Sequence, residues 1–215
     1  MSMRVAIVDY GMGNLASVSQ AFATLGAAPA VAATPSGLTG ADAIVLPGVG
    51  SFARAMANLT ARGFADSLTD RVIRRGVPFL GICLGMQLLA RRSPEGGVTD
   101  GLGWIDADVV PLASLMTQRL PVPHVGWNRV SLSPKSGLFV GQPEDATLYF
   151  DHEYAIADAG AATAATCRYG ATFCAAIERG NLFAVQFHPE KSQRAGLKLL
   201  RRFLEAAGDT RRDAA

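Results

Sequence analysis

Three residues far apart in the sequence have the types that nucleophilic catalysis needs. Cys83 stands between Gly81 and Gly85, and His188 and Glu190 stand two apart in the stretch "FHPE". A thiol becomes a good nucleophile when a histidine can accept its proton and a carboxylate holds that imidazole in the required tautomer. The sequence therefore predicts a catalytic cysteine, a histidine base and a glutamate that orients the histidine.

The apolar segment that carries Cys83, "FLGICLGMQLL", is typical of a buried strand followed directly by a helix. A strand, the pattern G-x-C-x-G and a helix together have the layout of a nucleophile elbow. In such a sharp turn, side chains at the two glycine positions would collide with neighbouring backbone. The turn would set the cysteine at a helix N-terminus, where the macrodipole favours the thiolate. The alternative is a buried structural cysteine, against which the histidine and glutamate argue.

A second glycine-containing loop, "LPGVGSF", follows another apolar segment. A carbonyl attacked by the sulfur develops an oxyanion, which backbone amides can stabilise. We expect these amides to come from Leu84 and from the loop residues Gly48, Val49 and Gly50. Taken alone, the loop is equally typical of an ordinary strand-to-helix turn.

The elements that must position these residues alternate along the first half of the chain. Buried parallel strands are predicted at 4–10, 42–50 and 77–82, and helices at 15–26, 67–76 and 84–92. Asn14 is placed to cap the first of these helices. Each glycine-containing loop follows a strand directly, so all of them would open on the same edge of a sheet.

From Gly101 onward, short β-rich segments with turn signals predict an antiparallel or mixed extension. A helix from about residue 192 closes the chain. The fold class is therefore α/β, with a doubly wound, mostly parallel sheet flanked by helices and a β-rich extension. We expect a single domain over residues 1–207 and a frayed tail over residues 208–215.

The composition is that of a globular protein with balanced charge. Of 215 residues, 49% are hydrophobic, and 20 basic residues against 18 acidic ones leave a net charge of +2. This balance argues against a nucleic-acid partner. The sequence shows neither a signal peptide nor an apolar run long enough to cross a bilayer, so we expect no membrane association and a cytoplasmic location.

The cysteines and histidines predict no metal site, and we expect no cofactor. Cys83, Cys167 and Cys174 match no zinc or disulfide framework, which favours a reducing compartment. Cys167 and Cys174 are expected to be small core residues or inert surface thiols. The histidines, at positions 124, 152 and 188, do not have ligand spacing.

These segments together resemble the class I (triad) glutamine amidotransferases, and among them the glutaminase subunits of imidazole glycerol phosphate synthase. The motifs that narrow the resemblance are "DYGMGNLASV", "LPGVGSF", "GICLGMQLL", "PHVGWN" and "VQFHPEKSQRAGLKLLRRF", in order along the chain. The resemblance implies that Cys83 forms a γ-glutamyl thioester with glutamine, that His188 acts as base and then acid, and that Glu190 orients His188.

The resemblance also implies a partner, a cyclase subunit with a (β/α)8 barrel, to which ammonia would pass. The cyclase would make imidazole glycerol phosphate and aminoimidazole carboxamide ribotide in histidine biosynthesis. In that family the glutaminase is nearly silent until the nucleotide site of the partner is filled, and rotation of the peptide before Val49 is a candidate switch. Implied substrate contacts are Gln87, His152 and Glu153, and implied partner contacts are Asn14, Trp127 and Asn128.

One stretch departs from the family pattern. The family usually reads close to "YFVHSY" where this chain reads "YFDHEY", so that Asp151 and Glu153 replace neutral residues on one face of a strand. Pointing outward, the carboxylates would be harmless. Pointing inward, they would repel the carboxylate of glutamine, favour its ammonium group or alter the partner contact.

Three other functions remain compatible with the sequence. The chain could serve another synthase of the same class, or it could be a stand-alone cysteine hydrolase of γ-glutamyl bonds. It could also be a regulatory scaffold, which the intact Cys83, His188 and Glu190 argue against.

Overall fold

The computed structural model describes residues 2–143 and 146–213. Its strands are β1 (Arg4–Val8), β2 (Ala28–Ala32), β3 (Ala43–Gly48), β4 (Phe79–Cys83), β5 (Arg92–Ser93), β6 (Thr99–Asp100), β7 (Val109–Pro111), β8 (His124–Leu132), β9 (Thr147–His152), β10 (Tyr154–Ile156), β11 (Thr163–Tyr169), β12 (Ala171–Arg179) and β13 (Leu182–Val185). Its α-helices are α1 (Leu15–Thr24), α2 (Phe52–Ala61), α3 (Phe64–Leu68), α4 (Leu84–Gln87), α5 (Leu112–Leu115) and α6 (Gln193–Asp213). Helix α3 continues into a π-helical stretch, Thr69–Arg74, and single 3-10 turns lie at Pro35–Leu38, Gly160–Ala162 and Pro189–Lys191.

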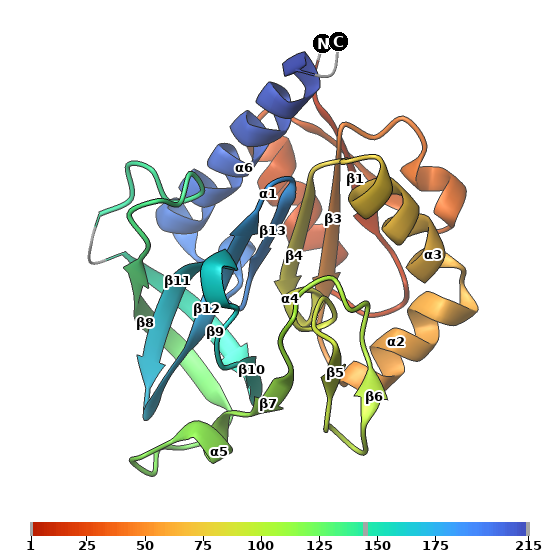
Figure 1. Cartoon of the computed structure of the whole chain (residues 1–215). Helices are drawn as coiled ribbons and strands as arrows, with labels where there is room; N and C mark the ends of the chain where they lie inside the picture. Colours follow the sequence, from red (N-terminus) through yellow and green to blue (C-terminus); the bar gives the residue numbers. More distant parts are fainter. Residues whose placement is uncertain (1, 144–145, 214–215) are drawn as a thin grey trace.

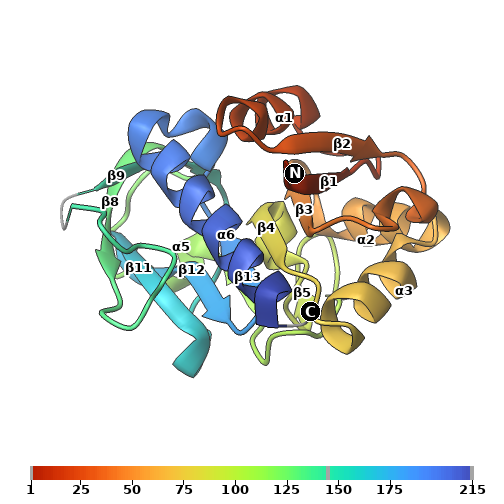
Figure 2. The same ribbon diagram turned by 90° about the horizontal axis from the view of Figure 1, so that it is seen from above.

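The central sheet has the order β2-β1-β3-β4-β13-β12-β11-β8-β9 (Figure 1). The strands from β2 to β13 run parallel, and each later neighbour in this order pairs antiparallel. Seen from above, α6 crosses the sheet over β13, where the parallel strands meet the antiparallel extension (Figure 2). The predicted mostly parallel sheet with a mixed extension is confirmed.

Both faces of the parallel half are covered by helices, which explains its continuous apolar strands. On one face, Phe22 of α1 and Phe203 of α6 pack edge to face, with ring centroids 6.2 Å apart. On the other, Phe52 of α2 and Phe64 of α3 are fully buried. The start of α1 is also set locally, since the side chain of Asn14 accepts a hydrogen bond from the Ser17 amide.

The pairing of β13 with β4 brings distant parts of the chain together. Val185 pairs with Ile82, so Cys83, at the end of β4, and His188, three residues after β13, come from the same ends of two neighbouring parallel strands. In Figure 1 these strands end at the lower edge of the sheet, beside α4 and β10. The sheet thus assembles the candidate site, as the strand order of an open α/β fold requires.

The helix predicted over residues 84–92 is wrong in length, because α4 ends at Gln87. The carbonyl groups of residues 88–91 accept hydrogen bonds from amides of residues 101–105 instead of from the next helical turn. Gly101 allows this approach, since a Cβ there would lie 2.3 Å from the Ala90 carbonyl oxygen. Arg92 then begins the β5–β6 hairpin. The sequence prediction also lacks α2 and the edge strand β2.

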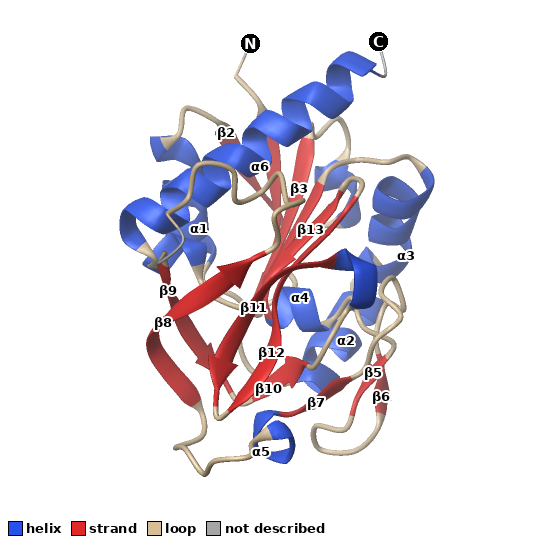
Figure 3. Ribbon diagram, turned by 60° about the vertical axis from the view of Figure 1, so that its left-hand side comes forward, coloured by secondary structure: helices blue, strands red, loops and turns tan. Residues whose placement is uncertain are grey.

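The β-rich extension predicted from Gly101 is present as strands β7 to β12 (Figure 3). In it, β8 and β9 pair with His124 opposite His152. Helix α6 buries Leu199, Leu200 and Phe203, whereas Leu197 is only half-buried. Because α6 extends to Asp213, part of the segment expected to fray is helical, and residues 214 and 215 lie outside the described residues.

Candidate active site

The predicted nucleophile elbow is present at the junction of β4 and α4. Cys83 has φ of 55° and ψ of −109°, a left-handed conformation that side chains rarely adopt. A Cβ at Gly85 would lie 1.9 Å from the Leu46 carbonyl oxygen, and one at Gly81 would lie 2.7 Å from the Gly85 carbonyl oxygen. A side chain at either position would therefore collide with the backbone, as the sequence predicts for both glycines.

His188 and Glu190 lie together next to the elbow. Nδ1 of His188 is 2.8 Å from Oε1 of Glu190, and the two side chains are only 3% and 2% exposed. Burial alone lowers the pKa of His188, but hydrogen bonds and charge from Cys83 and Glu190 outweigh burial and raise it to about 10. The imidazole is therefore suited to hold the proton that the Cys83 thiol gives up.

The thiol of Cys83 is buried and lies next to two polar groups. Its Sγ is 3.8 Å from the Asp151 carbonyl oxygen, and Nε2 of Gln186 donates toward Sγ over 3.7 Å. Cys83 is 5% exposed and opens into a pocket of about 310 Å³. The pocket also contains His188, so the nucleophile and its base share one space that a small substrate can enter.

The residues predicted for the oxyanion hole lie at this pocket. Leu84, Val49 and Gly50 line it, whereas Gly48 is buried behind them and pairs with Cys83 across β3 and β4. Gly50 has φ of +98°, which a side chain would strain. The two loops are thus adjacent, as the common strand edge predicts.

Gln87 lines the pocket, and its amide group is held by the protein. Nε2 donates to the Tyr154 carbonyl oxygen at 2.8 Å and to Oε1 of Gln186 at 3.0 Å. Gln186 in turn reaches Cys83, so these amides connect the nucleophile to strand β10. Gln87 is therefore fixed at the wall where the prediction places the amino-acid end of glutamine.

His152 also lines the pocket, but both of its ring nitrogens are engaged. Nδ1 is 2.9 Å from the Tyr154 carbonyl oxygen, and Nε2 is 3.0 Å from Nδ1 of His124. A carbonyl oxygen can only accept a hydrogen bond, so Nδ1 of His152 must carry the proton of the neutral ring. Nε2 of His152 then accepts a hydrogen bond from Nδ1–H of His124. Nε2 of His124 then accepts from Asn128 over 3.3 Å. The predicted contact of His152 with glutamine would therefore use its backbone or ring edge.

This histidine pair is neutral. Burial lowers the pKa of His124 to about 4, and burial together with the neighbouring histidines lowers that of His152 to about 3. His124 also stacks between the rings of Tyr169 and Phe150, with centroid distances of 4.0 and 4.8 Å. His152 is thus an uncharged part of the pocket wall, and His124 holds it in place from behind.

Three carboxylates lie at the mouth of the pocket. Asp151 and Glu153 are exposed residues, and both are among the residues that line it. Glu95, from the β5–β6 hairpin, lines it too, and its Oε2 accepts from the Phe52 amide at 2.8 Å. Burial and the charges of Glu153 and Glu95 raise the pKa of Tyr154. The mouth is therefore negatively charged.

Tyr10 was not among the expected site residues, yet it lies directly beneath the site. Its side chain is fully buried, and Oη has no hydrogen-bond partner among the described residues. A buried hydroxyl without a partner costs about 1–3 kcal/mol. Burial and the nearby Cys83 both raise the pKa of Tyr10, so the phenol is neutral.

Gln186 and Glu95 were likewise missed by the sequence analysis. Gln186 stands two residues before His188, in the segment that follows β13, and that spacing was the available signal. Glu95 follows a serine and a proline in a loop, and no local pattern marks it.

The predicted partner contacts lie outside the pocket. Asn14 is exposed and caps α1, and Trp127 is 47% exposed on β8. Asn128 donates from Nδ2 to the Arg168 carbonyl oxygen at 3.1 Å. Trp127 contacts the ring of Tyr149, with centroids 6.0 Å apart, so it lies near the strand that carries Asp151.

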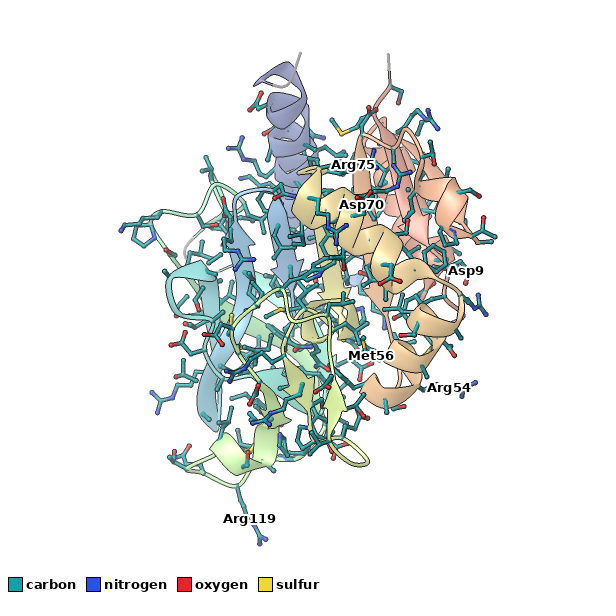
Figure 4. The ribbon with its side chains drawn as sticks, turned by 45° about the vertical axis from the view of Figure 1, so that its right-hand side comes forward. Asp9, Arg54, Met56, Asp70, Arg75 and Arg119 are labelled. Atoms are coloured by element: carbon teal, nitrogen blue, oxygen red, sulfur yellow. The ribbon has the colours of Figure 1, made fainter. Side chains whose placement is uncertain are left out.

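Other features of the described residues bear on alternative functions. Cys167 and Cys174 are buried free thiols whose pKa burial raises to about 12, so they are inert core residues. Within residues 2–143 and 146–213 no helix is long and apolar enough to cross a membrane, and no group of three His, Cys, Asp or Glu residues could hold a metal. Arg54 lies on α2, Arg119 lies in the loop after α5, and Arg75, which follows the π-helical stretch, pairs with Asp70 at 2.7 Å (Figure 4).

Comparison with known proteins bears on the same site. Residues 6–207 match the family described as glutamine amidotransferase class-I. The chain is 46% identical over 206 residues to imidazole glycerol phosphate synthase subunit HisH of Geobacter sulfurreducens, covering 94% of this chain and 98% of that protein. It is 47% identical over 198 residues to the HisH subunit of Symbiobacterium thermophilum, covering 92% of this chain and 91% of that one.

Solved structures support the fold. A glutamine amidotransferase superposes with a TM-score of 0.74 at 22% identity, covering 94% of this chain and 98% of that chain. PurLQS from Thermotoga maritima gives 0.72 at 17% identity, covering 98% and 99%. The chain therefore belongs to the class-I glutamine amidotransferases, among the HisH subunits of imidazole glycerol phosphate synthase.

Proposed function

We propose that this chain is the glutaminase subunit of an imidazole glycerol phosphate synthase and hydrolyses glutamine to glutamate and ammonia. The observation that carries the proposal is Cys83 on a strained elbow, sharing one pocket with His188, whose Nδ1 is 2.8 Å from Glu190. The identity of 46–47% to HisH subunits over more than nine-tenths of the chain supports the choice of synthase.

In the proposed reaction, His188 takes the thiol proton of Cys83, and the sulfur attacks the side-chain carbonyl carbon of glutamine. The resulting oxyanion is stabilised by the amides of Leu84 and of the Gly48–Gly50 loop. Collapse of this intermediate breaks the bond to nitrogen, His188 protonates the departing ammonia, and a γ-glutamyl thioester remains. Water, deprotonated by His188, then hydrolyses the thioester to glutamate.

The charge of the pocket suits the amino-acid end of glutamine. Glu95, Asp151 and Glu153 lie at the mouth, and the pocket-lining residues include neither lysine nor arginine. The α-ammonium group of glutamine would face these carboxylates. Gln87 lines the same pocket. The pocket volume of about 310 Å³ is at the small end for ligand sites, as expected for an amino acid.

We further propose that ammonia passes to a (β/α)8-barrel cyclase subunit, with Asn14, Trp127 and Asn128 on the facing surface. Trp127, half exposed on β8 beside Tyr149, is the kind of large aromatic side chain that anchors interfaces. The complex would act in the cytoplasm, where the three free cysteines stay reduced.

The test is ammonia release from glutamine by the chain alone, with the cyclase subunit, and with the cyclase subunit and its nucleotide substrate. We expect little release alone and a large rise in the full mixture. Cys83→Ala should reduce release at least about 10⁴-fold. Brisk release without a partner would instead indicate a stand-alone hydrolase, and activation by a different synthase would indicate another member of the class.

A further inference from the structure

The loop that follows β1 packs against the candidate oxyanion loop, Pro47–Gly50. A Cβ added at Gly48 would lie only 2.4 Å from Oη of Tyr10, and one added at Gly50 would lie 2.8 Å from Cε of Met12. The oxyanion loop is therefore bounded on one side by the Tyr10–Gly13 segment. Any rearrangement of the peptide that joins residues 48 and 49 takes place next to the Tyr10 hydroxyl.

The ring of Tyr10 is held firmly in that position. Its side chain is 0% exposed, and Asn58 of α2 donates from Nδ2 to the Tyr10 carbonyl oxygen at 3.0 Å. Arg62, on the same side of the molecule, donates to the Asp9 carbonyl oxygen at 3.2 Å. These bonds fix the backbone on both sides of the Cα atom, and the complete burial of the side chain keeps the hydroxyl away from solvent.

The hydroxyl is nevertheless without a partner among the described residues. Phenylalanine would fill the same space without burying a polar atom, so the hydroxyl is unfavourable in this arrangement of the loop. It becomes favourable if another arrangement supplies an acceptor. The Gly48 carbonyl group can become that acceptor, because Oη lies against Gly48, which has no side chain to separate the two.

The oxyanion loop has the freedom that such a second arrangement needs. Val49 is 44% exposed, and Gly50 adopts φ of +98°, while Gly48 is still paired with Cys83 at the end of β3. Rotation of one peptide unit would therefore occur at the point where the strand ends. When the Val49 N–H turns toward the pocket, the Gly48 carbonyl oxygen must turn in the opposite direction.

We propose that Tyr10 is a positioning residue for the oxyanion hole, whose hydroxyl donates a hydrogen bond to the Gly48 carbonyl oxygen when the Val49 N–H is aimed at the oxyanion. This inference rests on the proposed glutaminase function and its activation by a partner. Tyr10 does not line the pocket, so it acts on the loop and not on glutamine.

The experiment compares Tyr10→Phe with Tyr169→Phe in the full chain. Both changes remove one phenolic hydroxyl, but Oη of Tyr169 has a partner, the Pro121 carbonyl oxygen at 2.8 Å. For each variant, thermal unfolding of the isolated chain is measured, followed by kcat and KM for glutamine with the cyclase subunit and its nucleotide substrate present.

Tyr10→Phe should leave the Tm of the isolated chain unchanged or raise it, and it should lower the stimulated kcat about tenfold with KM changed less than about twofold. Removing an oxyanion-hole donor itself lowers kcat about 100-fold or more. Removing a residue that only positions the donor is expected to lower kcat less. Tyr169→Phe should do the reverse, lowering the Tm and leaving the stimulated kcat within about twofold of the wild type.

A Tyr10→Phe variant that loses Tm and keeps its stimulated kcat would overturn the inference, because the hydroxyl would then be a structural group of the resting protein. Stimulation of the wild type, absent in Cys83→Ala, keeps the proposed function standing in that case. If the wild type itself showed no stimulation, the proposed function and this inference would both fail.

Discussion

Two buried histidines in the same pocket, His188 and His152, have opposite electrostatic surroundings. His188 faces the carboxylate of Glu190 and the thiol of Cys83, and its pKa is raised to about 10. His152 faces the Tyr154 carbonyl oxygen and the neutral ring of His124, and its pKa is lowered to about 3. Both rings are almost fully enclosed, at 3% and 5% exposed.

The comparison shows that burial alone does not decide how a histidine behaves. Burial disfavours the charged ring in both cases, and only a negative partner at hydrogen-bond distance reverses that effect. His188 can therefore hold a proton during catalysis, whereas His152 and His124 stay neutral. The predictions that follow alter one side of this comparison at a time.

The largest effect is expected for His188→Asn, which removes the base and acid. The value of kcat should fall at least about 10⁴-fold, and the double variant with Cys83→Ala should be little worse than either single variant, since the two residues act as one unit. Stimulated ammonia release measures both. Additive losses in the double variant would mean that Cys83 and His188 work in separate steps.

Glu190→Gln gives His188 a neutral partner like that of His152. The pKa of His188 should fall, and kcat should fall by about 10³-fold, because the amide neither stabilises the imidazolium nor fixes the same tautomer. NMR titration of the ring and turnover measurements check the two effects together. A ring that still titrates as in the wild type would show that Cys83, and not Glu190, holds the proton on His188.

The elbow could be predicted from the sequence because its causes are local. Gly81 and Gly85 are required within a few residues of Cys83, and the periodic apolar strands on either side are equally local signals. The partners of Cys83 were found through their chemical types and the family resemblance, which brought together segments more than 100 residues apart.

The features that were missed depend on distant contacts. The end of α4 is set by amides of residues 101–105, and the edge strand β2 is alanine-rich and largely exposed, with only Ala32 buried. The orphan hydroxyl of Tyr10 exists only because Gly48 of another strand lies against it. A pattern read along the chain contains none of this information.

The hydrogen bond between the neutral His124 and His152 is expected to contribute to the free energy of unfolding. His152→Phe removes the acceptor of the His124 Nδ1 proton and should lower the free energy of unfolding by about 1–3 kcal/mol, since a buried donor loses its partner. His124→Phe/His152→Phe removes both partners and should cost less than the sum of the two single changes. Urea unfolding of the three variants tests this, and strict additivity would contradict the hydrogen bond.

The two kinds of histidine should also give pH dependences of opposite sign. Folded His124 and His152 resist protonation, so each contributes stability that is present above pH 6.5, the ordinary pKa, and is lost as the pH falls toward 4. His188 contributes stability that is complete below pH 6.5 and is lost as the pH rises toward 10.

Each group changes the slope by at most about 1.4 kcal/mol per pH unit. The unfolding free energy measured from pH 4 to pH 10 should therefore show a flatter acid side in His124→Phe/His152→Phe and a flatter alkaline side in Glu190→Gln. A variant that flattened the opposite side would reverse the assignment of charged and neutral histidines.

The smallest effect is expected at the mouth of the pocket, where Asp151 and Glu153 flank His152. Both carboxylates are exposed and screened by solvent, so Asp151→Val and Glu153→Ser should each raise KM for glutamine by about two- to threefold, through weaker attraction of the α-ammonium group. The increase in KM should be smaller in 0.5 M salt, because salt at that concentration screens most of the attraction between exposed charges. Steady-state kinetics at low and high salt provide the measurement. If KM fell instead, repulsion of the substrate carboxylate would dominate, and the acidic mouth would be a cost to glutamine binding.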